Sequence, residues 1–218
     1  MFHDRCDAGR RLAQAVLECR SPGRTVVLAL PRGGVPVAVP VAKALRAPLD
    51  LLLVRKVGAL GNPELAVGAV AEGDPPITVI DHATLDMTGE PPGQVLHRAS
   101  KEMAEIERRR ATYLAGRARV PLEGANVVLV DDGLATGTTV RAAVAAVRSQ
   151  RPARVMLAVP LGSVEGVAAI ASLVDELICL EQPDPFFGVG GHYDDFHQVT
   201  DGEVLAALAS LAPDRPGR

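Results

Sequence analysis

Apolar and polar positions along the chain follow two periods, one typical of amphipathic helices and one typical of buried strands. Apolar residues recur at three- and four-residue spacing over 4–18, which predicts a helix, and the apolar, β-branched run 25–30 predicts a buried strand. The same patterns predict further strands at 49–54, 126–130, 154–159 and 174–180. They predict further helices at 35–45, 94–115, 138–150 and 164–172, and a last helix that Asp201 caps and that ends near Leu211.

Strands that alternate with helices in this way indicate an α/β fold. Because the strands are continuous apolar runs, we expect a mainly parallel sheet with helices on both faces. Two segments depart from the alternation. In 56–92, short strands at 66–71 and 77–80 are separated by turns, and 181–200 is irregular and rich in Gly, Asp and aromatic residues. Ligands of parallel sheets bind at the carboxyl ends of the strands, so the loops at that edge are the candidate sites.

The irregular segments divide the chain into expected parts. A length of 218 residues with a hydrophobic fraction of 48% suits one compact domain with a small appendage. We expect a core over 1–180, which includes either a mobile loop or a static hairpin at 56–76. The remaining segment, 181–218, is expected to form a small irregular hood and the last helix.

Composition and charge exclude several classes of protein. With a formal net charge of −3 and only 3% aromatic residues, the chain lacks the basic balance and the stacking residues typical of nucleic-acid binding. Its three cysteines form no paired motif, which favours a reducing compartment. No signal peptide and no apolar run of about 18 residues is visible. We therefore expect a cytoplasmic protein that binds neither nucleic acid nor a membrane.

The candidate chemistry is concentrated where the strand 126–130 ends. Asp131 and Asp132 follow the strand directly, the loop 133–137 comes next, and a helix begins at Thr138. A helix N-terminus binds anions through its unpaired N–H groups and its positive dipole end, and the threonines here add hydroxyl donors. Adjacent carboxylates suit a diol, so the pattern predicts a site for a phosphorylated ribose. An ordinary strand–loop–helix junction is the alternative, whereas the missing lysine excludes a Walker A loop.

The sequence VVLVDDGLATGTT, residues 127–139, resembles the phosphoribosyl-diphosphate signature of type I phosphoribosyltransferases. The resemblance implies a glycosyltransferase that uses 5-phosphoribosyl 1-diphosphate, releases diphosphate, and takes a small nitrogen acceptor, for which a nucleobase is one candidate. It implies Mg²⁺ as cofactor, held mainly by the substrate. It also implies catalytic roles for Asp131 and Asp132, which would hold the ribose hydroxyls. The residues implied for the 5-phosphate are Ala135, Thr136, Gly137, Thr138 and Thr139.

Two further segments extend the expected site to a diphosphate. Arg32, Gly33 and Gly34 follow the first strand, and the two glycines permit unusual backbone angles from which N–H groups can surround an anion. A structural turn is the alternative there. Arg55 and Lys56 end the second strand, where two cations would neutralise a diphosphate, the alternative being a solvated strand end. The family resemblance favours diphosphate binding at both places.

Most aromatic residues of this aromatic-poor chain lie within 183–196. This segment loosely resembles the C-terminal hood of purine phosphoribosyltransferases. The resemblance makes Phe186, Phe187 and Tyr193 candidates for contact with the acceptor, and Asp194 a candidate for contact with a magnesium ion. A hydrophobic cluster or a dimer contact is the alternative, and a homodimer is therefore one expectation.

A second class of function stays open. A regulator or sensor that binds phosphoribosyl diphosphate or a nucleotide without catalysis would keep the same phosphate cup. A different transferase or hydrolase acting on a phosphoribosyl compound would keep it too.

The five histidines show no metal-ligand spacing, and the cysteines carry no motif of a thiol nucleophile. The residues at 127–139 therefore carry the functional prediction.

Overall fold

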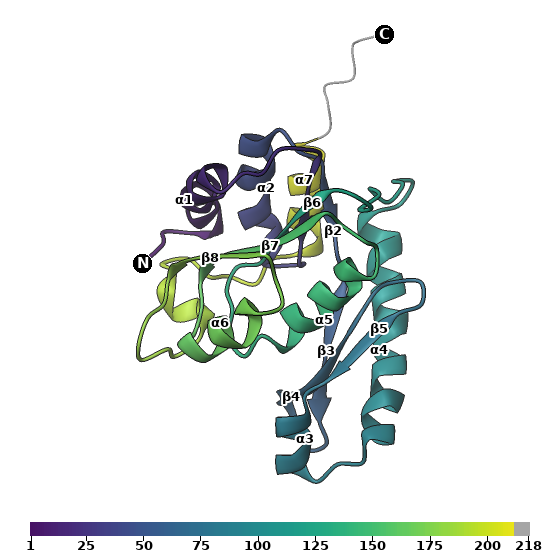
Figure 1. Cartoon of the computed structure of the whole chain (residues 1–218). Helices are drawn as coiled ribbons and strands as arrows, with labels where there is room; N and C mark the ends of the chain where they lie inside the picture. Colours follow the sequence, from purple (N-terminus) through teal and green to yellow (C-terminus); the bar gives the residue numbers. More distant parts are fainter. Residues whose placement is uncertain (212–218) are drawn as a thin grey trace.

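The computed structural model describes residues 1–211, apart from the side chain at position 64. At its centre is a five-stranded parallel sheet (Figure 1). The strands follow one another across this sheet in the order β2 (Leu49–Leu51), β1 (Thr25–Ala29), β6 (Asn126–Val130), β7 (Arg154–Leu161) and β8 (Glu176–Glu181). The predicted α/β fold with a mainly parallel sheet is confirmed. Residues 212–218, which end the expected 181–218 segment, lie outside the described part of the chain.

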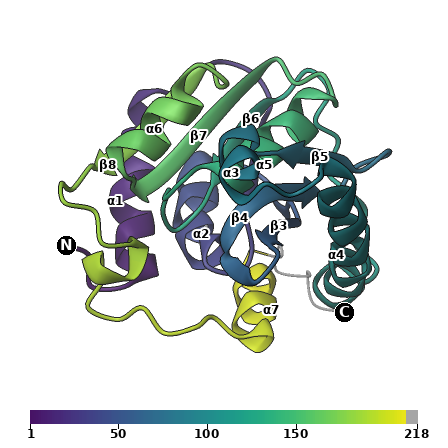
Figure 2. The same cartoon turned by 90° about the horizontal axis from the view of Figure 1, so that it is seen from below.

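Helices cover both faces of the parallel sheet (Figure 2). α1 (Arg5–Glu18) and α2 (Gly34–Leu45) pack on one face, and α5 (Thr138–Arg148) and α6 (Val164–Ala171) pack on the other. α7 (Asp201–Ala209) packs against α2. Within residues 1–211, none of the helices is both long enough and apolar enough to cross a bilayer.

Burial of both faces explains why the central strands are unbroken apolar runs. In β6, Val128 and Val130 belong to the core cluster that includes α1 and α2, whereas Val127 and Leu129 belong to the cluster around α5. All four side chains are at most 4% exposed. Burial of one such side chain contributes about 1.5–3 kcal/mol, so the strand that leads into the candidate site is firmly anchored.

A second, antiparallel sheet forms an arm in the lower part of Figure 1. It consists of β3 (Val54–Ala59), β4 (Asn62–Ala71) and β5 (Ile77–Ile80), and two helices, α3 (His82–Thr88) and α4 (Pro92–Tyr113), complete the arm. The arm packs against the main body through α5, which contacts all three of its strands. The arm thus lies next to the helix that begins at the predicted phosphate cup.

The single strand predicted at 49–54 is wrong, because the chain changes sheets within it. β2 ends at Leu51, the N–H of Leu52 still donates to the Ala29 carbonyl of β1 at 3.0 Å, and the first strand of the antiparallel sheet begins at Val54. The backbone N–H of Leu53 donates to a carboxylate oxygen of Glu72 at 3.0 Å, and the N–H of Glu72 donates to the Leu53 carbonyl at 2.9 Å. This exchange directs the chain out of the parallel sheet.

The segment 56–76 folds mainly as the hairpin of β3 and β4. The hairpin turns at Gly61, whose φ of +79° lies in the left-handed region that glycine adopts readily. A static hairpin was one of the two expectations for this segment. Its mobility stays a prediction, and so does the division of the chain at residue 180.

The predicted cap of the last helix is wrong by one residue. Thr200 caps α7: its hydroxyl accepts a hydrogen bond from the N–H of Glu203 at 3.2 Å, and the Glu203 carboxylate accepts one from the N–H of Thr200 at 2.8 Å. This reciprocal pair is a capping box, and the Thr-x-x-Glu spacing carried its signal. Asp201 instead accepts a hydrogen bond from the Tyr113 hydroxyl at 2.6 Å.

Candidate functional site

The loops that follow β1 and β6 meet at one edge of the parallel sheet. β1 pairs with β2 on one side and with β6 on the other, and β1 and β6 run in register from Thr25 beside Asn126 to Ala29 beside Val130. The connection after β1 leads to α2 on one face of the sheet, and the connection after β6 leads to α5 on the other face. Parallel sheets bind ligands in the crevice between two such connections. The 31–34 loop and the 131–137 loop, here called the cup loop, are therefore neighbours.

Two glycines allow these loops to pack directly on each other. A Cβ atom on Gly33 would lie 2.0 Å from Oδ2 of Asp132, and one on Gly34 would lie 2.7 Å from the carbonyl oxygen of Val130. Gly33 has ordinary helical angles, with φ −60° and ψ −35°. Our expectation that these glycines provide unusual backbone angles is therefore wrong, because they are required for space.

The cup loop and the start of α5 line a pocket of about 170 Å³. The pocket is formed by Asp131, residues 133–140 and Val189. Gly137 caps α5 in the left-handed conformation, with φ +78°. The first turn of a helix has N–H groups without intrahelical partners, so the pocket opens on a set of donors suited to an anion. The residues predicted to bind the 5-phosphate thus share one pocket.

The end of β7 holds the cup loop from the other side. The Ser163 hydroxyl donates to the Ala135 carbonyl at 2.6 Å, and Leu134 pairs with Gly162 in a short parallel bridge. A Cβ atom on Gly166 would lie only 2.0 Å from the Ala135 carbonyl oxygen. These contacts fix the cup loop before any ligand binds.

The two adjacent carboxylates face different neighbours. Asp131 lines the pocket, whereas Oδ2 of Asp132 accepts a hydrogen bond from Nε of Arg5 at 2.8 Å. The Asp132 carbonyl accepts another from the Tyr193 hydroxyl at 2.6 Å. Burial, and then the charge of Asp132, raise the pKa of Asp131 well above its usual range. Burial also raises the pKa of Asp132, and Arg5 opposes that rise.

Sequence reasoning missed two polar residues of this site, Arg5 and Asp81. Asp81 caps α3 and accepts a hydrogen bond from the Thr138 hydroxyl at 3.4 Å, and Thr138 lies 3.3 Å from the hydroxyl of Thr136. No local pattern indicates this contact, because 57 residues separate its partners. Arg5 gave one weak signal, since a basic residue opens α1 where the helix dipole favours acids.

The basic residues predicted to bind the diphosphate do not all lie where the sequence placed them, and two of them contact carboxylates. The Arg32 guanidinium lies 3.4 Å from a carboxylate oxygen of Asp201, and Arg55 donates to Glu102 on α4 at 2.8 Å. Arg55 and Lys56 were expected at the carboxyl end of the second parallel strand, and this is wrong, because both lie inside β3. A diphosphate role for them consequently depends on the arm that β3 belongs to.

The hood segment, residues 181–200, contains one short 3₁₀ helix, η1 (Val189–His192), and otherwise irregular chain. Phe186 stacks on the His192 ring, with 5.9 Å between ring centroids, whereas Phe187 is 87% exposed. Tyr193 is buried and belongs to a small hydrophobic cluster with residues of the N-terminus. Asp194 is exposed and lies 3.6 Å from the His3 ring. The acceptor candidates therefore differ widely in exposure.

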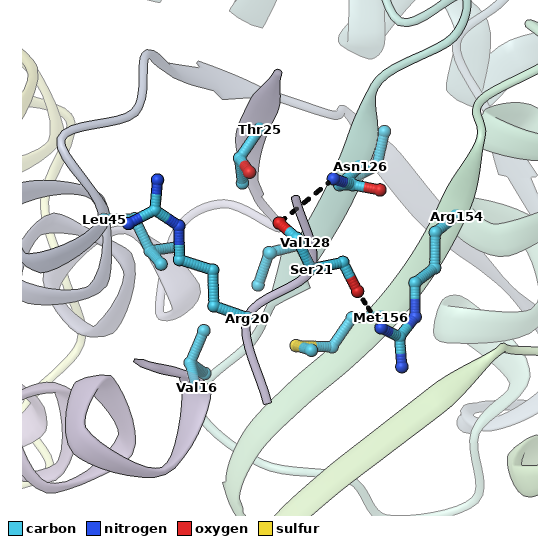
Figure 3. Close-up of a pocket in the computed structure, with 10 residues that line it drawn as sticks. Val16, Arg20, Ser21, Thr25, Leu45, Asn126, Val128, Arg154 and Met156 are labelled. Atoms are coloured by element: carbon cyan, nitrogen blue, oxygen red, sulfur yellow. Dashed lines mark hydrogen bonds between the residues drawn. The ribbon is translucent and has the colours of Figure 1, made fainter. Parts of the chain in front are cut away.

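Other cavities lie away from the cup, and two of them are distinguished by their lining residues. One cavity, of about 20 Å³, lies at the amino ends of the strands and has room for about one water molecule; Figure 3 shows the residues that line it. There Asn126 donates to the Ser21 carbonyl at 3.5 Å, and Arg154 donates to the Ser21 hydroxyl. The second cavity, of about 350 Å³, lies between α1, α2 and α7, and Arg5 forms part of its wall.

Protein side chains do not form a metal cage in the described part of the molecule. Within residues 1–211, no group of three or more His, Cys, Asp or Glu side chains is arranged to hold a metal ion. The pocket does contain one carboxylate, Asp131. Mg²⁺ commonly binds through one or two carboxylates together with phosphate oxygens of a substrate, and this donor set fits such an ion.

Comparison with known proteins extends the similarity to nearly the whole chain. Residues 2–195 match the model of the phosphoribosyl transferase domain. In two strains of Mycobacterium tuberculosis, relatives named "Putative phosphoribosyl transferase" are 45% identical over 216 residues, which cover 95% of this chain. The chain spans only 46% of the length of these relatives. The crystal structure of TT1426 from Thermus thermophilus is 40% identical, with a TM-score of 0.81 and coverage of 97% of this chain and 99% of that one.

Proposed function

The chain belongs to the phosphoribosyl transferase domain family, whose enzymes are of the glycosyltransferase type, and from this premise we propose a reaction. We propose that the protein transfers a phosphoribosyl group from 5-phosphoribosyl 1-diphosphate to a nitrogen acceptor and releases diphosphate. The observation that carries the proposal is the pocket at the start of α5, which combines the N–H groups of a helix N-terminus with the carboxylate of Asp131.

The phosphoribosyl donor would bind across the two neighbouring loops. Its 5-phosphate would occupy the pocket at residues 135–139, where N–H groups and the threonine hydroxyls are available. Its ribose hydroxyls would donate to Asp131, the carboxylate in the wall of that pocket. Its diphosphate would lie towards the 31–34 loop, which packs on Asp132 with no space for a larger side chain than glycine.

The transfer itself needs little covalent chemistry from the protein. The bond between C1 of the ribose and the diphosphate oxygen breaks, its electron pair leaves with the diphosphate, and the lone pair of the acceptor nitrogen forms the new bond to C1. Ionised Asp131 would stabilise the positive charge that develops on the ribose. The protein would hold phosphate and diphosphate apart in a fixed orientation, which lowers the entropic part of the barrier.

The charge of the leaving diphosphate has to be neutralised. Mg²⁺ bound together with the substrate would supply part of the positive charge, and Asp131 is the pocket carboxylate suited to help hold it. Arg32, Arg55 and Lys56 are the cations we propose for the rest. Arg32 and Arg55 now pair with Asp201 and Glu102, so binding of diphosphate would require them to change partners.

The acceptor would enter beside the hood segment, and a nucleobase is the acceptor class we propose. Phe187 is the hood aromatic most available for stacking, because 87% of it is exposed. Tyr193 would act differently: its hydroxyl fixes the carbonyl of Asp132, and its ring is buried. Tyr193 therefore positions the phosphoribosyl site instead of contacting the acceptor.

A turnover assay with a panel of acceptors tests this proposal. The protein is mixed with phosphoribosyl diphosphate, Mg²⁺ and one nitrogen base at a time, and diphosphate release is measured. We expect release that depends on one class of base and that Asp131→Asn lowers by about a hundredfold or more, the scale of a lost group that stabilises transition-state charge. Binding of phosphoribosyl diphosphate without turnover for any base would favour a regulator or sensor instead.

A further inference from the structure

Asp81 is a carboxylate of the arm that reaches the pocket at the start of α5. It directly follows β5 and caps α3, where its Oδ1 accepts a hydrogen bond from the N–H of Thr84 at 3.1 Å. Its own N–H donates to the Val67 carbonyl of β4 at 2.9 Å. Its second carboxylate oxygen, Oδ2, accepts a hydrogen bond from the Thr138 hydroxyl at 3.4 Å. Asp81 is thus fixed within the arm by two contacts and joins the arm to α5 by a third.

The capping of α3 explains only one of the two oxygens of Asp81. Oδ1 caps the helix, and asparagine or serine would cap it about as well. The second oxygen and the negative charge are turned to Thr138, which lines the pocket. A negative charge beside a pocket for an anion opposes binding of that anion. The position of Asp81 therefore indicates that the arm acts on the pocket.

The contact with Asp81 determines where the pocket hydroxyls donate. A hydroxyl donates one hydrogen bond, and a carboxylate only accepts, so the Thr138 proton is directed to Asp81. The hydroxyl oxygens of Thr136 and Thr138 lie 3.3 Å apart, and Thr136 can donate to Thr138 in this arrangement. Both hydroxyls then belong to a chain of hydrogen bonds that ends on the arm, and neither donates into the pocket.

A phosphate in the pocket would require the same proton. The oxygens of a phosphate dianion accept hydrogen bonds and donate none, so the Thr138 hydroxyl cannot donate to the phosphate and to Asp81 together. The charge of Asp81 adds repulsion at short range. Binding of the phosphate through this hydroxyl therefore breaks the contact between Thr138 and the arm.

We propose that Asp81 competes with the 5-phosphate for the Thr138 hydroxyl, so that a phosphate fills the pocket only when this contact between the arm and α5 is broken. The inference rests on the proposed function, because it takes the pocket to be the phosphate site. It also couples the pocket to β3, which pairs with β4 in the arm and carries Arg55 and Lys56, two of the cations proposed for the diphosphate.

The test is a titration of ribose 5-phosphate into the isotope-labelled wild type and Asp81→Asn at one neutral pH, followed by NMR. Asparagine keeps an oxygen for the cap of α3, removes the charge, and offers Thr138 a donor, which leaves the Thr138 proton available to the phosphate. We expect the affinity to rise by about tenfold or more, because the loss of a like charge and the gain of a hydroxyl donor add. In the wild type, the amide resonances of residues 81–84 should shift with the same saturation curve as those of the pocket.

The gain should depend on the Thr138 hydroxyl. In a Thr138→Val background, the proton for which Asp81 and the phosphate compete is absent, and only the charge of Asp81 still acts. Asp81→Asn should then raise the affinity by only about threefold, the effect of a nearby like charge in water. An equal gain in both backgrounds would overturn the competition, because Asp81 would then act through its charge alone.

Asp86→Asn is the matched control. Asp86 lies on the same helix and is exposed, so this variant removes the same charge from the arm without a change at Thr138. We expect its affinity for ribose 5-phosphate to equal that of the wild type, and an equal gain in this variant would overturn the proposal. Asp81→Ser, which also retains a cap, should raise the affinity too and replaces Asp81→Asn if that variant does not fold.

The outcomes separate this inference from the proposed function. Unchanged or weaker binding in Asp81→Asn, or a wild type whose residues 81–84 do not shift, would overturn the competition and leave the proposed reaction intact. A gain in Asp81→Asn without turnover of phosphoribosyl diphosphate for any acceptor would support the competition and remove the reaction. Absence of saturable binding in both proteins would remove the pocket as a phosphate site, and the inference would fall with it.

Discussion

The cup loop and the hood segment start from the same edge of the parallel sheet, yet they use their residues in opposite ways. The cup loop follows β6 and exposes polar groups to a pocket, and its glycines lie against side chains, Gly133 against Val189 and Gly137 against Ile170. The hood segment follows β8 and uses Tyr193 mostly for packing, against Phe2 and Phe196 at centroid distances of 5.5 and 5.0 Å. The first is organised for a ligand, and the second supports it.

The support is direct, because the hood segment touches the cup loop twice. The Tyr193 hydroxyl binds the Asp132 carbonyl at 2.6 Å. A Cβ atom on Gly133 would lie 2.5 Å from a methyl group of Val189 in η1. A substitution in the hood segment should therefore change the cup loop, and the size of the effect should follow the burial of the residue. The predictions below are arranged by decreasing effect, and those for Tyr193 and Phe187 test that rule.

The largest loss of stability is expected from Asp132→Asn. The neighbouring substitution Asp131→Asn is expected to cause little or no loss of stability. Asp132→Asn leaves the Arg5 charge buried without its partner, which costs about 3–5 kcal/mol of unfolding free energy. Asp131→Asn removes a carboxyl whose pKa burial already raises, so stability should be unchanged or higher, while substrate binding is weakened. Denaturant unfolding of both variants checks this, and equal losses of stability would contradict the different roles given to the two residues.

Gly33→Ala should show the tight contact between the two loops. The added Cβ would lie 2.0 Å from an oxygen that Arg5 holds in place, so overpacking should destabilise the protein by about 1–3 kcal/mol and weaken substrate binding. Gly93→Ala is the control, since a Cβ on that glycine in α4 meets nothing within 4 Å. Thermal unfolding and binding are measured for both. A neutral result for Gly33→Ala would mean that the loops separate easily.

Tyr193→Phe removes only the hydroxyl that binds the cup loop. We expect a loss of about 1–2 kcal/mol in unfolding free energy, because the partly buried Asp132 carbonyl loses a partner, and a modest loss of affinity for phosphoribosyl diphosphate. Unfolding and calorimetry on the same preparation measure both quantities. Reduced stability with unchanged affinity would show that the hood segment does not support the cup loop.

Phe187→Ala should have the smallest effect on stability, within about 0.5 kcal/mol, because the ring is exposed. If Phe187 stacks on the acceptor, the variant should raise the KM for the acceptor and leave affinity for the phosphoribosyl donor unchanged. Steady-state kinetics with the best base from the acceptor panel provides the measurement. An unchanged KM would exclude Phe187 from acceptor binding.

The difference between the two regions also explains what the sequence could predict. The cup loop is local: strand, acids, glycine and helix start are consecutive, so their geometry follows from their order. The parallel sheet was predicted for a similar reason, since burial of both faces leaves an unbroken apolar run in each strand.

Contacts between distant parts of the chain could not be predicted in this way. The ion pair of Arg5 and Asp132 joins positions 127 residues apart, and the contact of Asp81 with Thr138 joins positions 57 apart. The change of sheet after Leu51 depends on hydrogen bonds of Leu53 with the carboxylate and the N–H of Glu72, which no periodicity reveals. For the hood aromatics, the sequence shows that they are concentrated but not that Phe2 packs against them.

Binding of a phosphorylated ribose in the cup at the start of α5 can be measured directly through backbone amide chemical shifts. Ribose 5-phosphate is titrated into the isotope-labelled protein while backbone amide shifts are followed by NMR. We expect the largest shifts at residues 136–139, with the response weakened in Asp131→Asn. Absence of saturable shifts, or the largest shifts at the residues around the 350 Å³ cavity between α1, α2 and α7, would contradict it.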